Sequence, residues 1–117
     1  MSNKIIDLGL LVQEPLIFKD TTGELYTIPG EVSTKLYIKL TKLCEDIKKI
    51  TDEEEGFTKL QEIVTEILSL DKSKKIDIDY VKERFDDLRF LQVIVNEMMK
   101  HISEITNSPN SNSPDLK

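Results

Sequence analysis

Residues 85–105 constrain the fold of this chain more than any other segment. Apolar residues there recur at spacings of three and four, and seven of the ten residues from 90 to 99 are apolar. On a period of 3.6 residues per turn, they cover much more than one stripe of a helix. Such a helix must be covered on most of its sides, so the chain must fold around it or offer it to a partner.

Two more helices are predicted upstream. Leu36, Leu40, Leu43 and Ile47 alternate at spacings of four and three, which predicts a helix over 32–50. Cys44 lies beside this stripe and is expected to be a small core residue.

A second apolar stripe predicts a helix that ends near residue 70. Thr51 followed by Glu54 has the pattern of a capping box, so we expect Thr51 to cap it. Gly56 is unfavourable in the first turn, and a start two or three residues later is the alternative. Asp77 or Asp79 can cap the next helical region. There we expect a short helix over 78–85 and a bend before the main apolar helix.

The first thirty residues favour β structure. Residues 16–19 and 25–28 are β-prone runs, separated by a turn with Asp20 and Gly23, and this predicts a hairpin. Phe18, Tyr26 and Ile28 would form its inner face. Residues 5–12 are a candidate third strand.

These elements predict a mostly α, α+β fold, with an N-terminal β-hairpin and three or four helices packed as a small bundle. We expect one domain over 1–106, with a hairpin region at 1–30 and a helical region at 31–106. Residues 107–117 are rich in Asn, Ser and Pro, and cannot offset the entropy of ordering. They are predicted to be a disordered tail.

Charge and composition narrow the classes of function. The net charge of -6 opposes binding to nucleic acid. Lysines cluster at 35, 39 and 42 and again at 72, 74 and 75, but each cluster has acidic neighbours, so both are expected to be solvated surface. Charged residues interrupt every apolar run, so neither a signal peptide nor a membrane span is expected. The expected compartment is the host cytoplasm.

No catalytic motif stands out. His101, the single histidine, is expected at the surface of the last helical turns, and the four glycines form no phosphate-binding pattern. Two acidic pairs, Asp52 with Glu55 and Glu83 with Asp86, vaguely resemble the motifs of Mg²⁺-dependent all-α nucleotide pyrophosphohydrolases. The first pair departs from that motif, and helix capping explains it. We therefore expect no enzyme activity, cofactor or metal.

The main apolar helix is the candidate for partner binding. Its methionines adapt well to irregular apolar surfaces, so the helix is either core or a docking face for a partner or a second copy. The candidate partner-binding residues are Phe90, Ile94, Val95, Met98, Met99 and Ile102.

In its layout the chain resembles the tail assembly chaperones of long-tailed bacteriophages and Gram-positive prophages. The resemblance rests on the hairpin over 18–29, the entry to the first helix at Ser33 and Lys35, and the final helix ending at 107–110. It covers nearly the whole chain, but through layout rather than invariant motifs.

The resemblance implies a non-enzymatic helper of virion assembly. Such proteins bind the tape measure protein and recruit the major tail protein, keeping both soluble until the tail tube forms. A frameshift near the 3′ end often gives a longer form, and residues 107–117 would suit such a junction. Another small phage protein, such as a neck or tail-completion factor, is the alternative among binding proteins.

Overall fold

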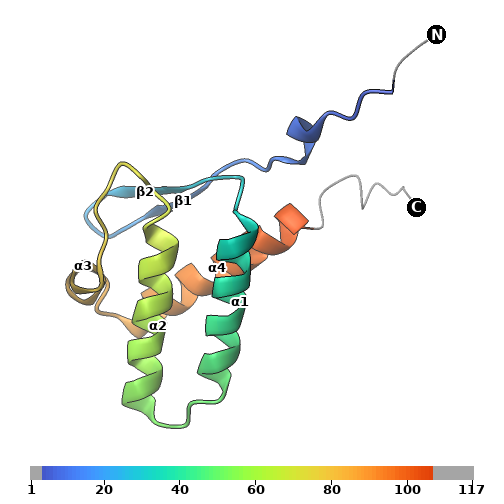
Figure 1. Cartoon of the computed structure of the whole chain (residues 1–117). Coiled ribbons are helices and arrows are strands. Elements are labelled where there is room, and N and C mark those ends of the chain that lie inside the picture. The colour runs from blue at the N-terminus through green and yellow to red at the C-terminus, as the bar shows by residue number, and fades with distance from the viewer. Residues whose placement is uncertain (1–3, 107–117) are drawn as a thin grey trace.

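The computed structural model describes residues 4–106, and its main body is a two-stranded hairpin followed by four α-helices (Figure 1). This confirms the predicted α+β fold. The predicted disordered tail, 107–117, lies outside the described residues. The elements, in chain order, are a 3₁₀ turn η1 (Leu8–Leu11), β1 (Leu16–Lys19), β2 (Leu25–Ile28), α1 (Thr34–Lys48), α2 (Glu53–Leu68), α3 (Ile78–Arg84) and α4 (Leu88–Thr106).

The hairpin forms where the sequence predicts it. β1 and β2 are antiparallel, with Leu16 opposite Ile28. Gly23 has a φ of 93°, a backbone conformation that glycine adopts without steric cost and that closes the turn. Tyr26 and Ile28 are fully buried, and Phe18 is half-buried against the core, which confirms the predicted inner face.

α1 and α2 each begin directly after a short polar residue whose side chain caps the helix. Ser33 Oγ accepts a hydrogen bond from the Leu36 N–H at 3.1 Å and caps α1. The predicted cap of α2 at Thr51 is wrong, because Asp52 Oδ2 accepts the hydrogen bond from the Glu55 N–H at 2.8 Å. A carboxylate satisfies the open N–H group and also favours the positive end of the helix dipole.

The predicted bend between α3 and α4 is confirmed. Asp77 caps α3, and Phe85 ends it with a backbone outside the helical region. Asp87 then accepts hydrogen bonds from the Arg89 side chain and backbone, which lower the pKa of its carboxyl to about 2. The break turns the chain so that α4 crosses behind α1 and α2 (Figure 1).

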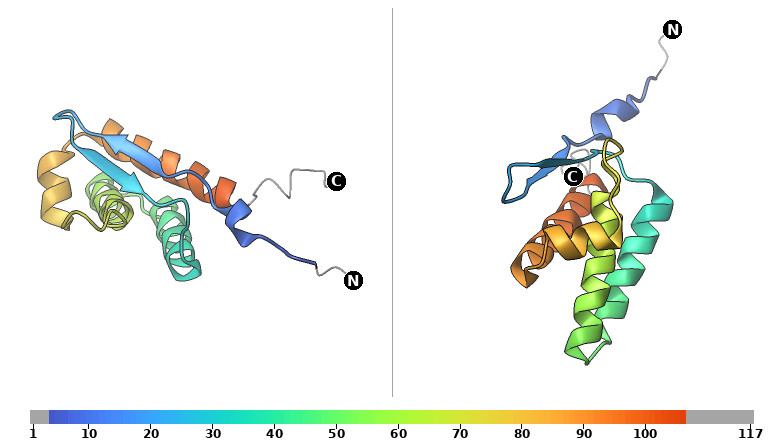
Figure 2. Two further views of the ribbon diagram at one scale, coloured as in Figure 1. Left: turned by 90° about the horizontal axis from the view of Figure 1, so that it is seen from above. Right: turned by 90° about the vertical axis from the view of Figure 1, so that its left-hand side faces the viewer.

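The core lies where α2 and α4 meet beneath the hairpin (Figure 2). β1 packs over α4 and β2 packs over α2, while α1 packs along α2. The predicted apolar helix is therefore covered from two sides, by α2 and by the hairpin. The side chains of α4 in this core are Leu91, Ile94, Val95, Met98 and Ile102.

α1 contributes little to the core, since Leu40 is its one buried residue. Cys44 is half-buried and packs against the core, with its Sγ 3.9 Å from the Met99 Sδ. Burial raises the pKa of the Cys44 thiol, which disfavours the reactive thiolate. This position fits the predicted role as a packing residue.

The predicted third strand over 5–12 is wrong. Asp7 Oδ1 accepts a hydrogen bond from the Gly9 N–H at 2.9 Å and starts the 3₁₀ turn η1. An aspartate that bonds two residues ahead favours a turn over a strand. The segment extends away from the body in both views of Figure 2.

Candidate docking groove

A hydrogen-bond network at the hairpin turn holds the hairpin to α3. Asp20, whose side chain is 3% exposed, accepts bonds from the Tyr26 hydroxyl at 2.8 Å and from Arg84 Nη1 at 3.1 Å. It also accepts from the Thr22 N–H and hydroxyl and from the Glu24 N–H. Its acceptor capacity is filled by this structural role, which leaves little for proton transfer.

The hydrogen bonds of this network keep Asp20 ionised and Tyr26 neutral. Burial disfavours the charged form of Asp20, but the hydrogen bonds from Thr22, Tyr26 and Arg84 outweigh it and hold the pKa of Asp20 well below its usual range. Burial and the hydrogen bonds with Tyr80 and Asp20 raise the pKa of Tyr26. An ionised Asp20 only accepts, so the Tyr26 hydroxyl donates to it and accepts from the Tyr80 hydroxyl at 2.7 Å.

The loop between α2 and α3 occupies the outer edge of β2. Asp71 Oδ2 accepts a hydrogen bond from the Thr27 N–H at 2.8 Å, and Asp71 Oδ1 accepts from the Ser73 N–H and hydroxyl. The bonds from Ser73 and Thr27 lower the pKa of this buried carboxyl. Within residues 4–106, the backbone of β1 has no corresponding partner on its outer edge.

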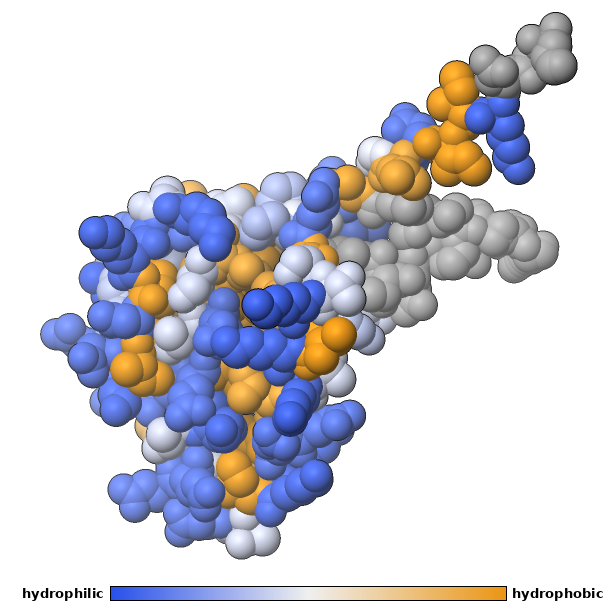
Figure 3. All heavy atoms as spheres, viewed as in Figure 1, coloured by the Kyte–Doolittle hydropathy of each residue, from blue (hydrophilic) through white to orange (hydrophobic). Residues whose placement is uncertain are grey.

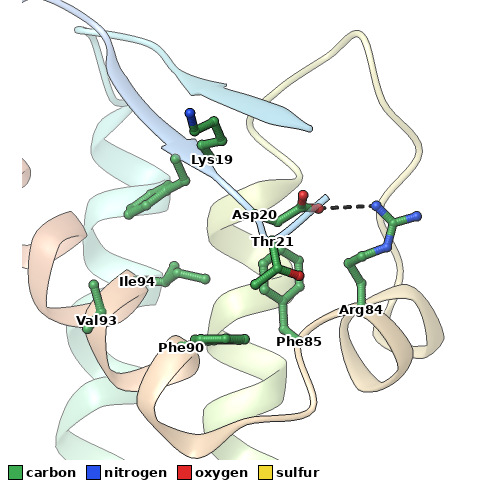
Figure 4. Close-up of a pocket in the computed structure, with 9 residues that line it drawn as sticks. Lys19, Asp20, Thr21, Arg84, Phe85, Phe90, Val93 and Ile94 are labelled. Atoms are coloured by element: carbon green, nitrogen blue, oxygen red, sulfur yellow. Dashed lines mark hydrogen bonds and ion pairs between the residues drawn. The ribbon is translucent and has the colours of Figure 1, made fainter. Parts of the chain in front are cut away.

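A groove runs between β1 and α4, close to this open edge. Its cavity has a volume of about 250 Å³, and Figure 4 shows Phe90 extending from α4 toward Phe85, with Ile94 extending in the same direction. We call it the docking groove. Its lining residues are Phe18, Lys19, Asp20, Thr21, Arg84, Phe85, Phe90, Val93 and Ile94.

The docking groove has an apolar floor and a charged rim. Val93 is 55% exposed, so an apolar side chain remains open to water at the groove. Arg84 and Asp20 form an ion pair at one end, drawn as a dashed line in Figure 4. Lys19 lies on the β1 side and forms no ion pair within the described part of the chain.

The six predicted partner-binding residues do not lie on one surface. Ile94 and the half-buried Phe90 line the docking groove. Met99 is half-buried and faces Cys44. Core packing, the alternative to docking, accounts for the remaining three residues, Val95, Met98 and Ile102. A partner role for any of the six stays a prediction.

The sequence pattern missed the residues that β1 contributes to the groove. The pattern predicts Phe18 on the inner face of the hairpin but gives no functional role to Lys19. The signal that could have found them is the alternation along β1, which places Phe18 on the face toward the helices. Which helix it meets depends on the tertiary packing.

The predicted surface position of His101 is wrong. Its side chain is buried, and Nε2 lies 2.9 Å from the backbone oxygen of Pro29. Since a carbonyl only accepts, Nε2 donates and ties α4 to the end of β2. This bond gives His101 a structural role between α4 and the hairpin.

The lysine clusters are mostly exposed, as predicted, with Lys74 as the exception. Its ammonium group pairs with Glu24 and lies 5.3 Å from the centre of the Tyr26 ring. Lys74 therefore helps to hold the hairpin on the loop after α2.

The carboxylate pairs do not converge. Asp52 caps α2, and among residues 4–106 no three His, Cys, Asp or Glu side chains are grouped so that they could hold a metal ion. Within the same residues, no helix has the length and apolar character needed to cross a membrane.

Comparison with known proteins adds no family or fold relative. The chain matches no family model, and no curated protein or solved structure is significantly similar to it.

Proposed function

We propose that this protein is a non-enzymatic assembly chaperone of a phage or prophage tail, acting in the host cytoplasm. In this proposal it binds the tape measure protein and recruits the major tail protein. The observation that carries the binding role is the apolar docking groove beside the open edge of β1. The phage assignment rests on the resemblance in layout described above.

The size of the groove favours a protein client over a small molecule. Small-molecule sites usually enclose about 300–1,000 Å³ and bury most of the ligand. The docking groove has a volume of about 250 Å³, and its lining residue Val93 is exposed to water. A groove of this size can accept one large apolar side chain that anchors a client helix. Phe90 and Val93 would contact that side chain, and the strongly acidic whole would keep the complex soluble.

Co-expression with the tape measure protein tests the proposal. We expect the wild-type chain to keep the tape measure protein in the soluble fraction and to co-purify with it. Val93→Asp should remove both effects, because it places a charge in the apolar groove. Val93 is largely exposed, so the variant should keep the wild-type circular dichroism.

Asn96→Asp is the matched control, because it adds the same charge to an exposed position of α4 that does not line the groove. It should retain client binding. If the tape measure protein is equally insoluble with and without the chain, the proposal is wrong. Finding the chain in finished virions would favour the neck or tail-completion alternative. Mg²⁺-dependent nucleotide hydrolysis lost in Glu83→Ala would favour the hydrolase.

A further inference from the structure

The N-terminal arm, residues 4–12, exposes more apolar surface than any segment of similar length in the described chain. Ile5, Ile6, Leu8 and Leu10 are between 66% and 85% exposed. Figure 3 shows their apolar surface on the arm that extends from the body. Contiguous apolar surface of this kind marks an interaction site, because its exposure to water is unfavourable.

The arm is fixed at its base, where it leaves the body. The Gln13 N–H donates to the Gly30 oxygen at 3.3 Å, and Gln13 Nε2 donates to the Glu104 oxygen at 3.3 Å. The backbone of Gln13 lies so close to Gly30 that a Cβ there would be 1.6 Å from the Gln13 oxygen. These contacts lie at the start of β1, whereas the docking groove lies at its end. The arm therefore points away from the groove of its own chain.

The arm and the groove are both largely apolar, and each carries a charge that the other can pair. The arm has Lys4 at its start and Asp7 among its apolar residues, and the groove has an apolar floor with Lys19 on its rim. The one acidic group of the groove, Asp20, is already paired with Arg84. An arm in the groove would bring Asp7 to a lysine that has no ion pair among the described residues, while its leucines covered Phe90 and Val93.

We propose that the chain forms a dimer in which the arm of each copy occupies the docking groove of the other. The exchange is reciprocal, so two identical contacts close a two-fold assembly. The free β1 edge beside the groove would also offer backbone groups to an arm that lies along it.

A second consequence rests on the proposed function. If the groove also receives the client, the arm covers it while no client is bound, and the client must displace the arm. Breaking the arm should then leave client binding intact or strengthen it, because the competitor is gone. The dimer itself does not depend on this consequence.

Analytical ultracentrifugation of full-length variants, without a client, tests the dimer. We expect wild type to sediment as a dimer at tens of micromolar. Leu8→Asp/Leu10→Asp breaks the arm and Val93→Asp breaks the groove, and each variant alone should be a monomer. Both sets of side chains are largely exposed, so the fold should survive, as circular dichroism would verify.

Mixing the two variants is the decisive step. One retains a groove and the other retains an arm, so the mixture should form a heterodimer through one intact contact. Asp7→Lys should weaken the wild-type dimer, and adding Lys19→Asp should restore it. A monomeric wild type overturns the inference, as does a Val93→Asp chain that still dimerises through arm-to-arm contact. Either result would leave the proposed function untested, because the co-expression assay does not depend on the dimer. In that assay Val93→Asp should abolish binding of the tape measure protein whether or not the arms exchange.

Discussion

The Asp71 carboxylate accepts a hydrogen bond from the Thr27 backbone N–H at 2.8 Å, across 44 residues of sequence. It joins the loop after α2 to the outer edge of β2. A free strand edge invites pairing with another chain, and a side-chain acceptor is one way to close it. Among residues 4–106, the hairpin is therefore closed on the β2 side and open on the β1 side, beside the docking groove.

Asp71→Ala should destabilise the protein by about 2–3 kcal/mol, because it removes charge-assisted hydrogen bonds and leaves the Thr27 N–H without its partner. Urea unfolding measures the loss, and amide exchange should show Thr27 exchanging faster. Lys72→Ala, an exposed change in the next residue, is the control and should stay within about 0.5 kcal/mol of wild type. Unchanged exchange at Thr27 in Asp71→Ala would contradict the role of this bond.

Acid should unfold the protein partly through Asp20. The folded-state pKa of this carboxyl is lowered from an ordinary value of 3.8. Its contribution to stability is therefore fully present above about pH 4, and is lost as the pH falls toward the folded-state pKa. Asp20→Asn should be less stable than wild type at pH 7 and should lose less stability between pH 4 and pH 2. Thermal unfolding across this range measures both effects.

Asp86→Asn is the matched control for acid unfolding, since Asp86 is exposed. It should follow the wild-type pH dependence. A wild-type slope in Asp20→Asn would mean that other carboxyls, such as Asp71, account for the acid sensitivity.

Gly30→Ala should destabilise the junction of the arm and the body. Its Cβ would lie 1.6 Å from the Gln13 oxygen and 2.6 Å from the Gln13 carbonyl carbon, so backbone must move. The expected loss is about 1–3 kcal/mol by thermal or urea unfolding. Gly56→Ala makes an informative contrast, because its Cβ meets only the Ile50 side chain at 3.8 Å inside α2. That change should stabilise by up to about 1 kcal/mol. Equal effects of the two substitutions would rule out this account.

His101→Leu keeps a bulky side chain in the core but removes the donor to the Pro29 oxygen. Pro29 is exposed, so water can reach its oxygen, and the expected loss is that of one ordinary hydrogen bond, about 0.5–1.5 kcal/mol by urea unfolding. Lys100→Leu, at the exposed neighbouring position, should change stability little. If His101→Leu is as stable as wild type, water must replace the histidine or the bond contributes little.

The turns, helix caps and buried helix faces could be predicted from the sequence, because each depends on residues that are close together in the chain. Gly23 closes a turn, Asp77 caps a helix, and the apolar spacing around Leu91 marks a buried face. Thr51 and Asp52 are neighbouring residues that can each cap a helix, so the sequence alone does not show which of them caps α2. In the structure α2 begins at Glu53, and Asp52 is the cap.

The docking groove could be found only in part. The apolar pattern of α4 predicts Phe90 and Ile94 as binding residues, and both line the groove. The same pattern predicts Met98, which is fully buried in the core. All three share one amphipathic helix, and periodicity alone does not say what covers each side. The β1 wall, with Phe18 and Lys19, comes from a distant part of the sequence.

By itself, then, the sequence determined the α+β class, the hairpin turn and the break before α4, since each depends on neighbouring residues. Tertiary structure decided that His101 is buried under Pro29, that the arm does not pair as a third strand, and that an apolar groove opens beside β1. These outcomes depend on which surfaces remain after the hairpin, α2 and α4 have packed together. No local pattern carries that information.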